Sequence, residues 1–384
     1  MKRISDPLPI GKKLVLKNRL ARSGTHDAIS YGGHLTPQVG KIYHDLAAGG
    51  VGMIITGQTE VSRSGGTADC AVRAYLPEYE TELRAIADNV HACGSVLIVQ
   101  LNHGGIKSRS QPNPLVGPSP CEPAPGVTVR ALTEDEIAGI VADFARAAVK
   151  SHAAGADGVQ IHNAHGYLLA TFYSPKTNRR TDRYGGSREN RARIIFEIYD
   201  AIRAAVPDPG FVVGIKTNLS DLIEPSISAE DSLWLCQELE RRGLDFAEFS
   251  CGLMPGGPGP AAFLPMPEEP WQPIFYRATA DMARQLTIPV FAVNGYRVPD
   301  DIERCLNESE IQGISLCRPL IREPDLPRRW LSGDRSPARC TSCGACEADT
   351  NWIQRCEKKP DVVPEVKWFG CPLEQRRPRT AALS

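Results

Sequence analysis

Two histidines and a tyrosine, His162, His165 and Tyr167, lie within six residues, where a mostly apolar run ends. The run, residues 158–161, has the composition of a short buried strand. Two imidazoles can donate hydrogen bonds to one substrate oxygen, and a phenol beside them can supply a proton. The same residues could instead satisfy backbone groups in a strand-to-helix turn. Because a dense polar run, residues 176–183, follows closely, we interpret the trio as catalytic.

The elements that must position this trio recur along the chain. An amphipathic helix-like stretch, a glycine that can end it and a short β-branched run follow one another repeatedly. Helix starts such as Thr36-Pro37 and the capping box at residues 133–136 lie between the strand candidates. Eight alternations predict an α/β fold, a (β/α)8 TIM barrel, with a doubly wound open sheet as the alternative. The strand candidates are residues 20–21, 51–55, 95–101, 158–161, 211–216, 246–249, 288–293 and 313–316.

Length and composition are consistent with one large barrel. The chain has 384 residues, 42% of them hydrophobic, and such barrels take roughly 250 residues or more. We expect the barrel at residues 1–335 and a short cysteine-rich extension at residues 336–384. No GxGxxG or P-loop pattern follows a strand candidate, so a Rossmann-type cofactor site has no support. Active sites of barrels lie at the carboxyl ends of the strands, where the trio would lie.

The charge balance bears on partners and location. There are 44 basic and 45 acidic residues, which favours neither nucleic acid nor a membrane surface as a partner. The amino terminus is interrupted by prolines and charges, and no later run approaches the roughly 18 apolar residues that cross a bilayer. We therefore expect a cytoplasmic protein, and we expect a homo-oligomer.

The central segment carries a longer pattern that can be compared with known families. It reads His162-Asn163-Ala164-His165-Gly166-Tyr167-Leu168-Leu169, then Ser174-Pro175, Asn178, Arg180-Thr181-Asp182 and Tyr184-Gly185-Gly186. This resembles the signature of the old yellow enzyme family of flavin-dependent ene-reductases, especially the branch with 2,4-dienoyl-CoA reductase and trimethylamine dehydrogenase. The resemblance implies an FMN-dependent oxidoreductase that uses NAD(P)H to reduce the C=C bond of an α,β-unsaturated carbonyl or thioester. His162 and His165 would hold the carbonyl oxygen. Hydride would pass from reduced flavin to the β-carbon, and Tyr167 would protonate the α-carbon.

The resemblance also assigns FMN contacts to the loops that follow the strands. Small residues in the first loop would let a planar ligand lie against the backbone. Trimethylamine dehydrogenase has a cysteine bonded covalently to FMN at the position of His26, so we expect non-covalent flavin here. The predicted FMN contacts are Ser23, Gly24, Thr25, His26, Gly57, Gln58, Gln100, Lys216, Asn294, Gly295, Cys317 and Arg318.

Residue chemistry supports several of these contacts. The amide of Gln100 can both donate to and accept from a flavin edge. Lys216 ends an apolar strand, where a cation is costly unless it meets an anion, and many relatives have arginine there. The loops after the last two barrel strands commonly bind phosphate, and Arg318 is the expected clamp. Asn294 and Cys317 stand where the family has glycine, which matters if the backbone angles require glycine.

Five of the twelve cysteines lie in the carboxyl-terminal segment. Cys340, Cys343 and Cys346 have CxxCxxC spacing, and with Cys356 they could surround one metal centre through thiolates. Cys371 is a competing fourth ligand. Structural disulfides are a weaker explanation in a reducing cytosol. The resemblance to trimethylamine dehydrogenase implies a 4Fe-4S cluster, while structural zinc and an unfilled site remain alternatives.

Three further alternatives stay open. NAD(P)H reduces FMN directly at the barrel mouth, or a separate electron-donor protein delivers electrons through the cluster. The substrate is a small unsaturated carbonyl compound, or the chain is an amine dehydrogenase or demethylase, or a non-catalytic electron carrier or sensor. The Gly- and Pro-rich segment 251–273, with Trp271, forms a pocket wall or a surface insertion.

Overall fold

Eight parallel strands form a closed barrel. The computed structural model describes residues 1–341 apart from residues 28, 68–69, 109–113 and 254–274. Each strand pairs with the next in chain order, and the last pairs back with the first. The strands are β3 (Leu20–Arg22), β4 (Met53–Ile55), β7 (Val96–Asn102), β11 (Gly158–Asn163), β12 (Val212–Asn218), β13 (Phe246–Ser250), β14 (Val290–Ala292) and β15 (Gly313–Leu316). Each overlaps a predicted strand, so the predicted (β/α)8 TIM barrel is confirmed.

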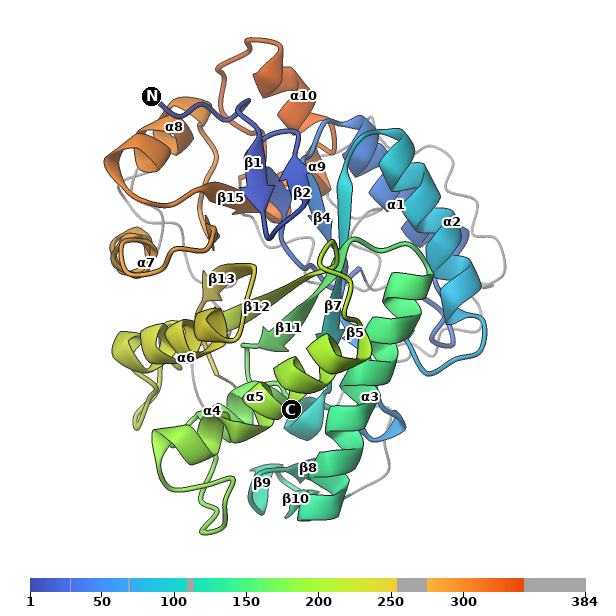
Figure 1. The fold of residues 1–384 in the computed structure, drawn as a ribbon, viewed down its shortest axis with the longest axis vertical. Helices are drawn as coiled ribbons and strands as arrows, with labels where there is room; N and C mark the ends of the chain where they lie inside the picture. The colour runs from blue at the N-terminus through green and yellow to red at the C-terminus, as the bar shows by residue number, and fades with distance from the viewer. Residues whose placement is uncertain (28, 68–69, 109–113, 254–274, 342–384) are drawn as a thin grey trace.

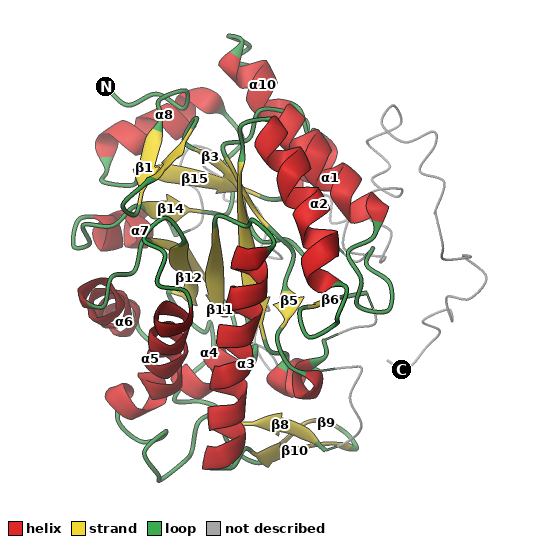
Figure 2. Ribbon diagram, turned by 45° about the vertical axis from the view of Figure 1, so that its right-hand side comes forward, coloured by secondary structure: helices red, strands yellow, loops and turns green. Residues whose placement is uncertain are grey.

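Helices surround the barrel on the outside (Figures 1 and 2). The predicted helix starts are confirmed: Thr36 caps α1 with Pro37 in the first turn, and Thr133 and Glu136 form a capping box on α3. The helices are α1 (Pro37–Ala48), α2 (Tyr79–Ala92), α3 (Glu134–Ala153), α4 (Leu168–Tyr173), α5 (Arg188–Ala205), α6 (Ala229–Arg241), α7 (Tyr276–Ala283), α8 (Pro299–Glu308), α9 (Arg318–Arg322) and α10 (Leu326–Leu331).

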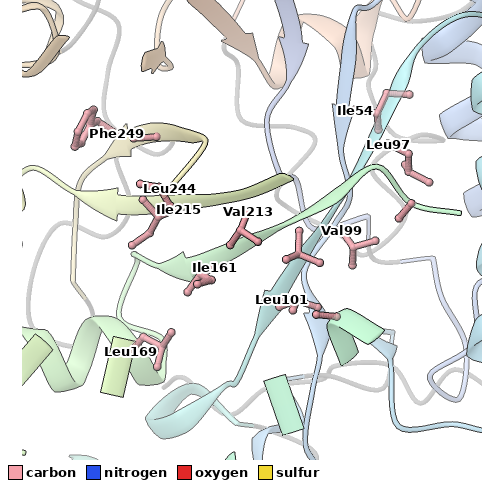
Figure 3. Packing of buried hydrophobic residues seen from close by; sticks show 14 of the residues in the cluster. Ile54, Leu97, Val99, Leu101, Ile161, Leu169, Val213, Ile215, Leu244 and Phe249 are labelled. Carbon is pink, nitrogen blue, oxygen red and sulfur yellow. The ribbon is translucent and has the colours of Figure 1, made fainter. Parts of the chain in front are cut away.

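Alternate residues of each strand face the helices and the barrel interior. The outward-facing residues form one large apolar cluster with the helices, and Figure 3 shows Leu97, Val99, Ile161, Val213 and Ile215 within it. The residues between them on the same strands therefore point into the barrel. This alternation decides which side chains can reach a ligand at the barrel mouth.

The amino-terminal end of the barrel interior is filled and covered by apolar side chains. The hairpin of β1 (Leu8–Ile10) and β2 (Leu14–Leu16) packs onto a cluster that contains Met53, Phe246 and Phe291. Sequence analysis did not predict this hairpin. Because this end is closed by apolar residues, polar side chains of the interior gather at the carboxyl end.

Smaller elements decorate the barrel mouth. β5 (Thr59–Glu60) pairs with the end of β7 and with β6 (Val72–Arg73). The 3-10 helices η1 (Arg63–Gly65) and η2 (Gly105–Lys107) follow the exits of β5 and β7.

A separate three-stranded sheet of β8 (Leu115–Gly117), β9 (Cys121–Ala124) and β10 (Val127–Ala131) precedes α3. No helix in the described part of the chain is long and apolar enough to cross a membrane. The predicted division at residue 335 stays a prediction, because the described residues end at 341.

Candidate active site

The exit of β11 brings the predicted catalytic trio together. His162 is the last inward-facing residue of the strand, and the chain then turns sharply through His165 and Gly166, whose φ angles are +62° and +73°. The ring centroid of His162 lies 5.2 Å from that of His165 and 5.0 Å from that of Tyr167. A positive φ is uncommon for a residue other than glycine, and here it accompanies the turn of the second imidazole toward the first.

Neighbouring strands and η2 hold these rings in place. Ser250 Oγ, at the end of β13, lies 2.7 Å from His165 Nε2, and Asn218 Oδ1 accepts from the His165 backbone N–H at 3.3 Å. Lys107 Nζ donates to the His165 carbonyl at 2.6 Å and lies 5.0 Å from the centroid of the Tyr167 ring. His162 Nδ1 is buried and has no hydrogen-bond partner. It is therefore available to a ligand.

Both imidazoles are neutral at pH 7. Burial lowers the pKa of His162 well below its usual value, and the charges of Lys216 and Lys107 lower it further. The pKa of His165 is lowered in the same way, by burial first and then by His162 and the two lysines. A neutral imidazole still carries one N–H donor. The pair can therefore donate hydrogen bonds to an oxygen without itself carrying charge.

A row of buried polar side chains crosses the barrel beside the trio. Lys216 Nζ donates to Ser23 Oγ at 2.8 Å and lies 3.3 Å from Glu248 Oε2. Gln160 Nε2 donates to the same Glu248 oxygen at 3.2 Å, and Gln100 Nε2 donates to Gln160 Oε1 at 2.8 Å. These residues come from neighbouring barrel strands and the exit of β3. Lys216 therefore has a carboxylate partner within the protein.

Sequence analysis missed Glu248, and a signal was present. Glu248 lies two residues after Phe246 on β13, so the two side chains point to the same face of the strand. Because Phe246 faces the barrel interior, Glu248 does as well. Glu248 is completely buried, and its Oε1 atom has no hydrogen-bond partner. A charged residue at an inward position of a buried strand indicates a functional site.

The residues present fit FMN, as three observations indicate. Buried polar atoms of His162 and Glu248 lack partners, as groups that receive a polar ligand would. Gly24 packs on the Gln100 amide so closely that an added Cβ would lie 2.4 Å from Nε2, so only glycine fits where the first loop meets this predicted contact. The predicted contacts Ser23, Gln100 and Lys216 belong to this connected set.

The loops that follow β3, β4 and β15 meet at the rim of the barrel mouth. Thr25 Oγ1 lies 3.2 Å from Cys317 Sγ, and Gln58 Nε2 lies 3.4 Å from His26 Nδ1. The Gly57 backbone N–H donates to the Tyr43 hydroxyl at 2.9 Å. Predicted FMN contacts from three separate loops are thus adjacent, as a shared ligand requires.

Backbone angles explain both departures from the family's glycines. Asn294 has φ +80° and Gly295 has φ +107°, in the region that glycine favours and asparagine tolerates. Cys317 has φ −123°, which needs no glycine. Arg318 begins α9, and its charge helps to lower the pKa of Arg297, after burial as the main cause. Arg297 was not predicted, and it adds a second cation near the expected phosphate clamp.

The cysteine-rich segment is only partly described. Arg297 donates to the Cys340 carbonyl, and its Nη2 atom lies 3.9 Å from the Cys340 sulfur. Cys343, Cys346, Cys356 and Cys371 lie outside the described residues. Within residues 1–341, less the gaps given above, no three His, Cys, Asp or Glu side chains are grouped as metal ligands. The predicted 4Fe-4S cluster stays a prediction, as does the pocket wall at residues 251–273, most of which are not described.

Comparison with known proteins identifies the family of this barrel. A sequence model of the NADH:flavin oxidoreductase / NADH oxidase family matches residues 3–335. The chain belongs to this family. A "Metal reductase" of Desulforamulus reducens is 32% identical and spans 99% of this chain, which covers 54% of that protein.

Two solved structures of the same fold are similar to this flavin oxidoreductase. A complex of 2-naphthoyl-CoA reductase superposes with a TM-score of 0.82 at 25% sequence identity. The matched region is 89% of this chain and 54% of the reductase chain. Morphinone reductase in complex with tetrahydroNAD superposes with a TM-score of 0.73 at 27% sequence identity. The matched region is 87% of this chain and 91% of the morphinone reductase chain. The chain thus spans about half the length of the metal reductase and of 2-naphthoyl-CoA reductase. The predicted old yellow enzyme family, the family of NADH:flavin oxidoreductases, is confirmed.

Proposed function

We propose that this chain is an FMN-dependent enzyme that reduces the C=C bond of an α,β-unsaturated carbonyl or thioester with electrons from NAD(P)H. The observation that carries the proposal is the arrangement at the exit of β11. The neutral imidazole of His162 is in ring contact with both the imidazole of His165 and the phenol of Tyr167. The similarity to 2-naphthoyl-CoA reductase and morphinone reductase supports this substrate class.

The two imidazoles would hold the carbonyl oxygen of the substrate. Negative charge develops on that oxygen when the double bond is reduced, and preorganised N–H donors stabilise it. Ser250 fixes the ring of His165, and the free Nδ1 edge of His162 is buried. Bound FMN would supply the hydride transfer between NAD(P)H and the substrate.

Tyr167 would donate a proton to the α-carbon. The ammonium group of Lys107, 5.0 Å from the phenol ring centroid, would stabilise the phenolate that remains. Lys107 also contacts the His165 carbonyl. A single cation therefore supports both the hydrogen-bonding pair and the acid.

The cofactor contacts proposed from the sequence follow the same logic. Gln100, Lys216 and the loop at residues 23–26 would hold the flavin ring, and Arg318 with the turn at residues 294–295 would hold its phosphate. A cluster at Cys340, Cys343, Cys346 and Cys356, an electron-donor protein, a homo-oligomeric state and a cytoplasmic location remain part of the proposal.

Anaerobic absorption spectroscopy of the purified protein tests this function. We expect NADH or NADPH to bleach the visible flavin bands, and cyclohex-2-enone or an enoyl thioester to restore them. Trimethylamine should not bleach them; bleaching by trimethylamine and no response to the enone would favour an amine dehydrogenase. A protein that binds FMN and exchanges electrons with neither compound would contradict both activities.

A variant connects the activity to the trio. His162→Ala removes one donor to the carbonyl oxygen, and we expect enone turnover to fall by on the order of 10² to 10³. The matched control is His44→Gln, which changes an exposed histidine on α1. A His162→Ala enzyme that keeps bound FMN and turns over enone at the wild-type rate would remove His162 from this role.

A further inference from the structure

A partly exposed cysteine, Cys70, lies at the rim of the barrel mouth beside an imidazole. Its sulfur is 3.6 Å from His26 Nε2, and the other ring nitrogen, Nδ1, is 3.4 Å from Gln58 Nε2. Gln58 Nε2 also donates to Thr67 Oγ1 at 3.1 Å, and Thr67 Oγ1 donates to Glu60 Oε1 at 2.9 Å. A continuous chain of hydrogen bonds therefore leads from a buried carboxylate to a thiol.

The direction of each bond in this chain can be assigned from its carboxylate end. Glu60 is fully buried, pairs with Arg73 at 3.3 Å and also accepts from the Thr67 backbone N–H, so it acts as an ionised acceptor. The hydroxyl of Thr67 must donate to Glu60, and its oxygen then accepts from an amide N–H of Gln58.

The same reasoning fixes the tautomer of the imidazole. Asn102 Nδ2 donates to Gln58 Oε1 at 2.7 Å, which holds the amide in the orientation that turns Nε2 toward His26. The second hydrogen of Gln58 Nε2 then points at His26 Nδ1. Because Nδ1 accepts, the proton of a neutral His26 ring is on Nε2, which faces Cys70. The imidazole is thus set to donate to the sulfur.

A sulfur that receives an N–H is stabilised as a thiolate, and the thiolate is the reactive form of cysteine. We propose that Cys70 is a reactive thiol that exchanges with small organic disulfides at the barrel mouth. Its sulfur attacks one sulfur of the disulfide, a Cys70–S–S–R bond forms and the original S–S bond breaks. The leaving thiolate takes a proton from water, and a second thiol reverses the reaction.

Two features of the surroundings fit a modification site better than a metal site. Cys70 and Cys317 both pack against Ile321, so the thiol lies on an apolar patch at the rim. No group of three metal-ligating side chains occurs among the described residues, which include His26, Cys70 and Cys317. The inference goes beyond the proposed function, since thiol exchange needs neither FMN nor an enone.

Peptide mapping by mass spectrometry tests the inference on the full-length protein. The protein is incubated with oxidised glutathione at pH 7, and the rate of glutathione attachment is followed for each cysteine. We expect Cys70 to react about threefold or more faster than Cys93, because a larger thiolate fraction outweighs the lower nucleophilicity of a more acidic thiol. Cys93 is the matched control, a partly buried thiol at the end of α2.

Variants test the hydrogen-bond chain. His26→Phe removes the donor, and Thr67→Val removes the hydroxyl that orients Gln58. We expect both to lower the rate at Cys70 toward that of Cys93, and neither to change the rate at Cys93. Equal rates for Cys70 and Cys93 in the wild-type protein would overturn the proposal without any variant. An unchanged Cys70 rate in folded His26→Phe protein would also overturn it.

Discussion

Tyr167 is the one member of the trio that carries an ionisable O–H, and it lies under the charge of Lys107. Tyr167→Phe removes the proton donor and keeps the ring. We expect the half-reaction with the enone to slow by roughly 10²-fold and the half-reaction with NAD(P)H to change less than about twofold, as stopped-flow absorption would measure. Equal slowing of both half-reactions would remove Tyr167 from the acid role.

Glu248 neutralises the charge of Lys216 at a distance of 3.3 Å inside the barrel. Glu248→Gln keeps the shape and leaves the ammonium uncompensated, so a bound flavin ring would gain electrons more readily. We expect its midpoint potential to rise by about 30 mV or more, which corresponds to a tenfold change for two electrons.

Spectroelectrochemistry with a reference dye measures this potential. Glu238→Gln is the control, because Glu238 pairs with Arg241 on the outer side of α6. A potential in Glu248→Gln that is unchanged or lower would show that the carboxylate does not control the flavin.

Residue types at the strand exits allowed much of the site to be predicted. The trio and Lys216 were found because polar residues follow apolar runs of the sequence. Ser250 and Lys107 were not found, since their contacts with His165 join residues 85 and 58 positions apart. Such contacts depend on how strands are arranged around the barrel, which no local pattern records.

At the scale of elements, Gly214 on β12 shows how closely the barrel interior is packed. A Cβ added there would lie 2.2 Å from the ring of Phe246 on the neighbouring strand. We expect Gly214→Ala to lower the free energy of unfolding by about 1 to 3 kcal/mol, measured by urea denaturation.

Gly139→Ala is the matched control for this change. Gly139 lies inside α3, and an added Cβ there meets nothing within 4 Å. Because alanine favours a helix more than glycine does, we expect this variant to be more stable by up to about 1 kcal/mol. A Gly214→Ala protein whose free energy of unfolding equals that of the wild-type protein would contradict the packing described for the interior.

The repeating strands and helices of the barrel could be predicted from the sequence, and the short additional strands at its two ends could not. Eight apolar runs suffice for a barrel, because each is flanked by a helical stretch and the same order of helix, glycine and apolar run recurs along the chain. The hairpin of β1 and β2 and the pair of β5 and β6 have strands of only two or three residues. Runs that short have no periodicity of their own, and these four lie outside the repeated order of helix and strand, so their pairing depends on the finished barrel.

At the scale of the whole molecule, buried imidazoles couple stability to pH. Burial lowers the pKa of His103 from the ordinary 6.5 to about 3, and it lowers the pKa values of His162 and His165 as well. The folded protein therefore stays unprotonated at these rings while the unfolded chain binds protons below pH 6.5. Stability is lost as pH falls, by up to about 1.4 kcal/mol per pH unit for each ring.

Urea denaturation between pH 7.5 and pH 5 measures this loss, in a range where most carboxylates of an unfolded chain stay ionised. His103→Asn removes one of the three rings and should make the dependence on pH less steep. A free energy of unfolding that is constant over this range would show that the rings take up protons in the folded protein as readily as in the unfolded chain.

The hairpin of β1 and β2 covers the amino-terminal end of the barrel with apolar side chains, so the described polar groups that could bind a ligand lie at the carboxyl end. We expect the nucleotide and the acceptor both to bind at that end, beside His162 and Tyr167, and therefore to bind in turn. Steady-state rates are measured against acceptor concentration at several fixed concentrations of NAD(P)H. We expect parallel lines in a double-reciprocal plot, and we expect each reactant in excess to inhibit the reaction of the other.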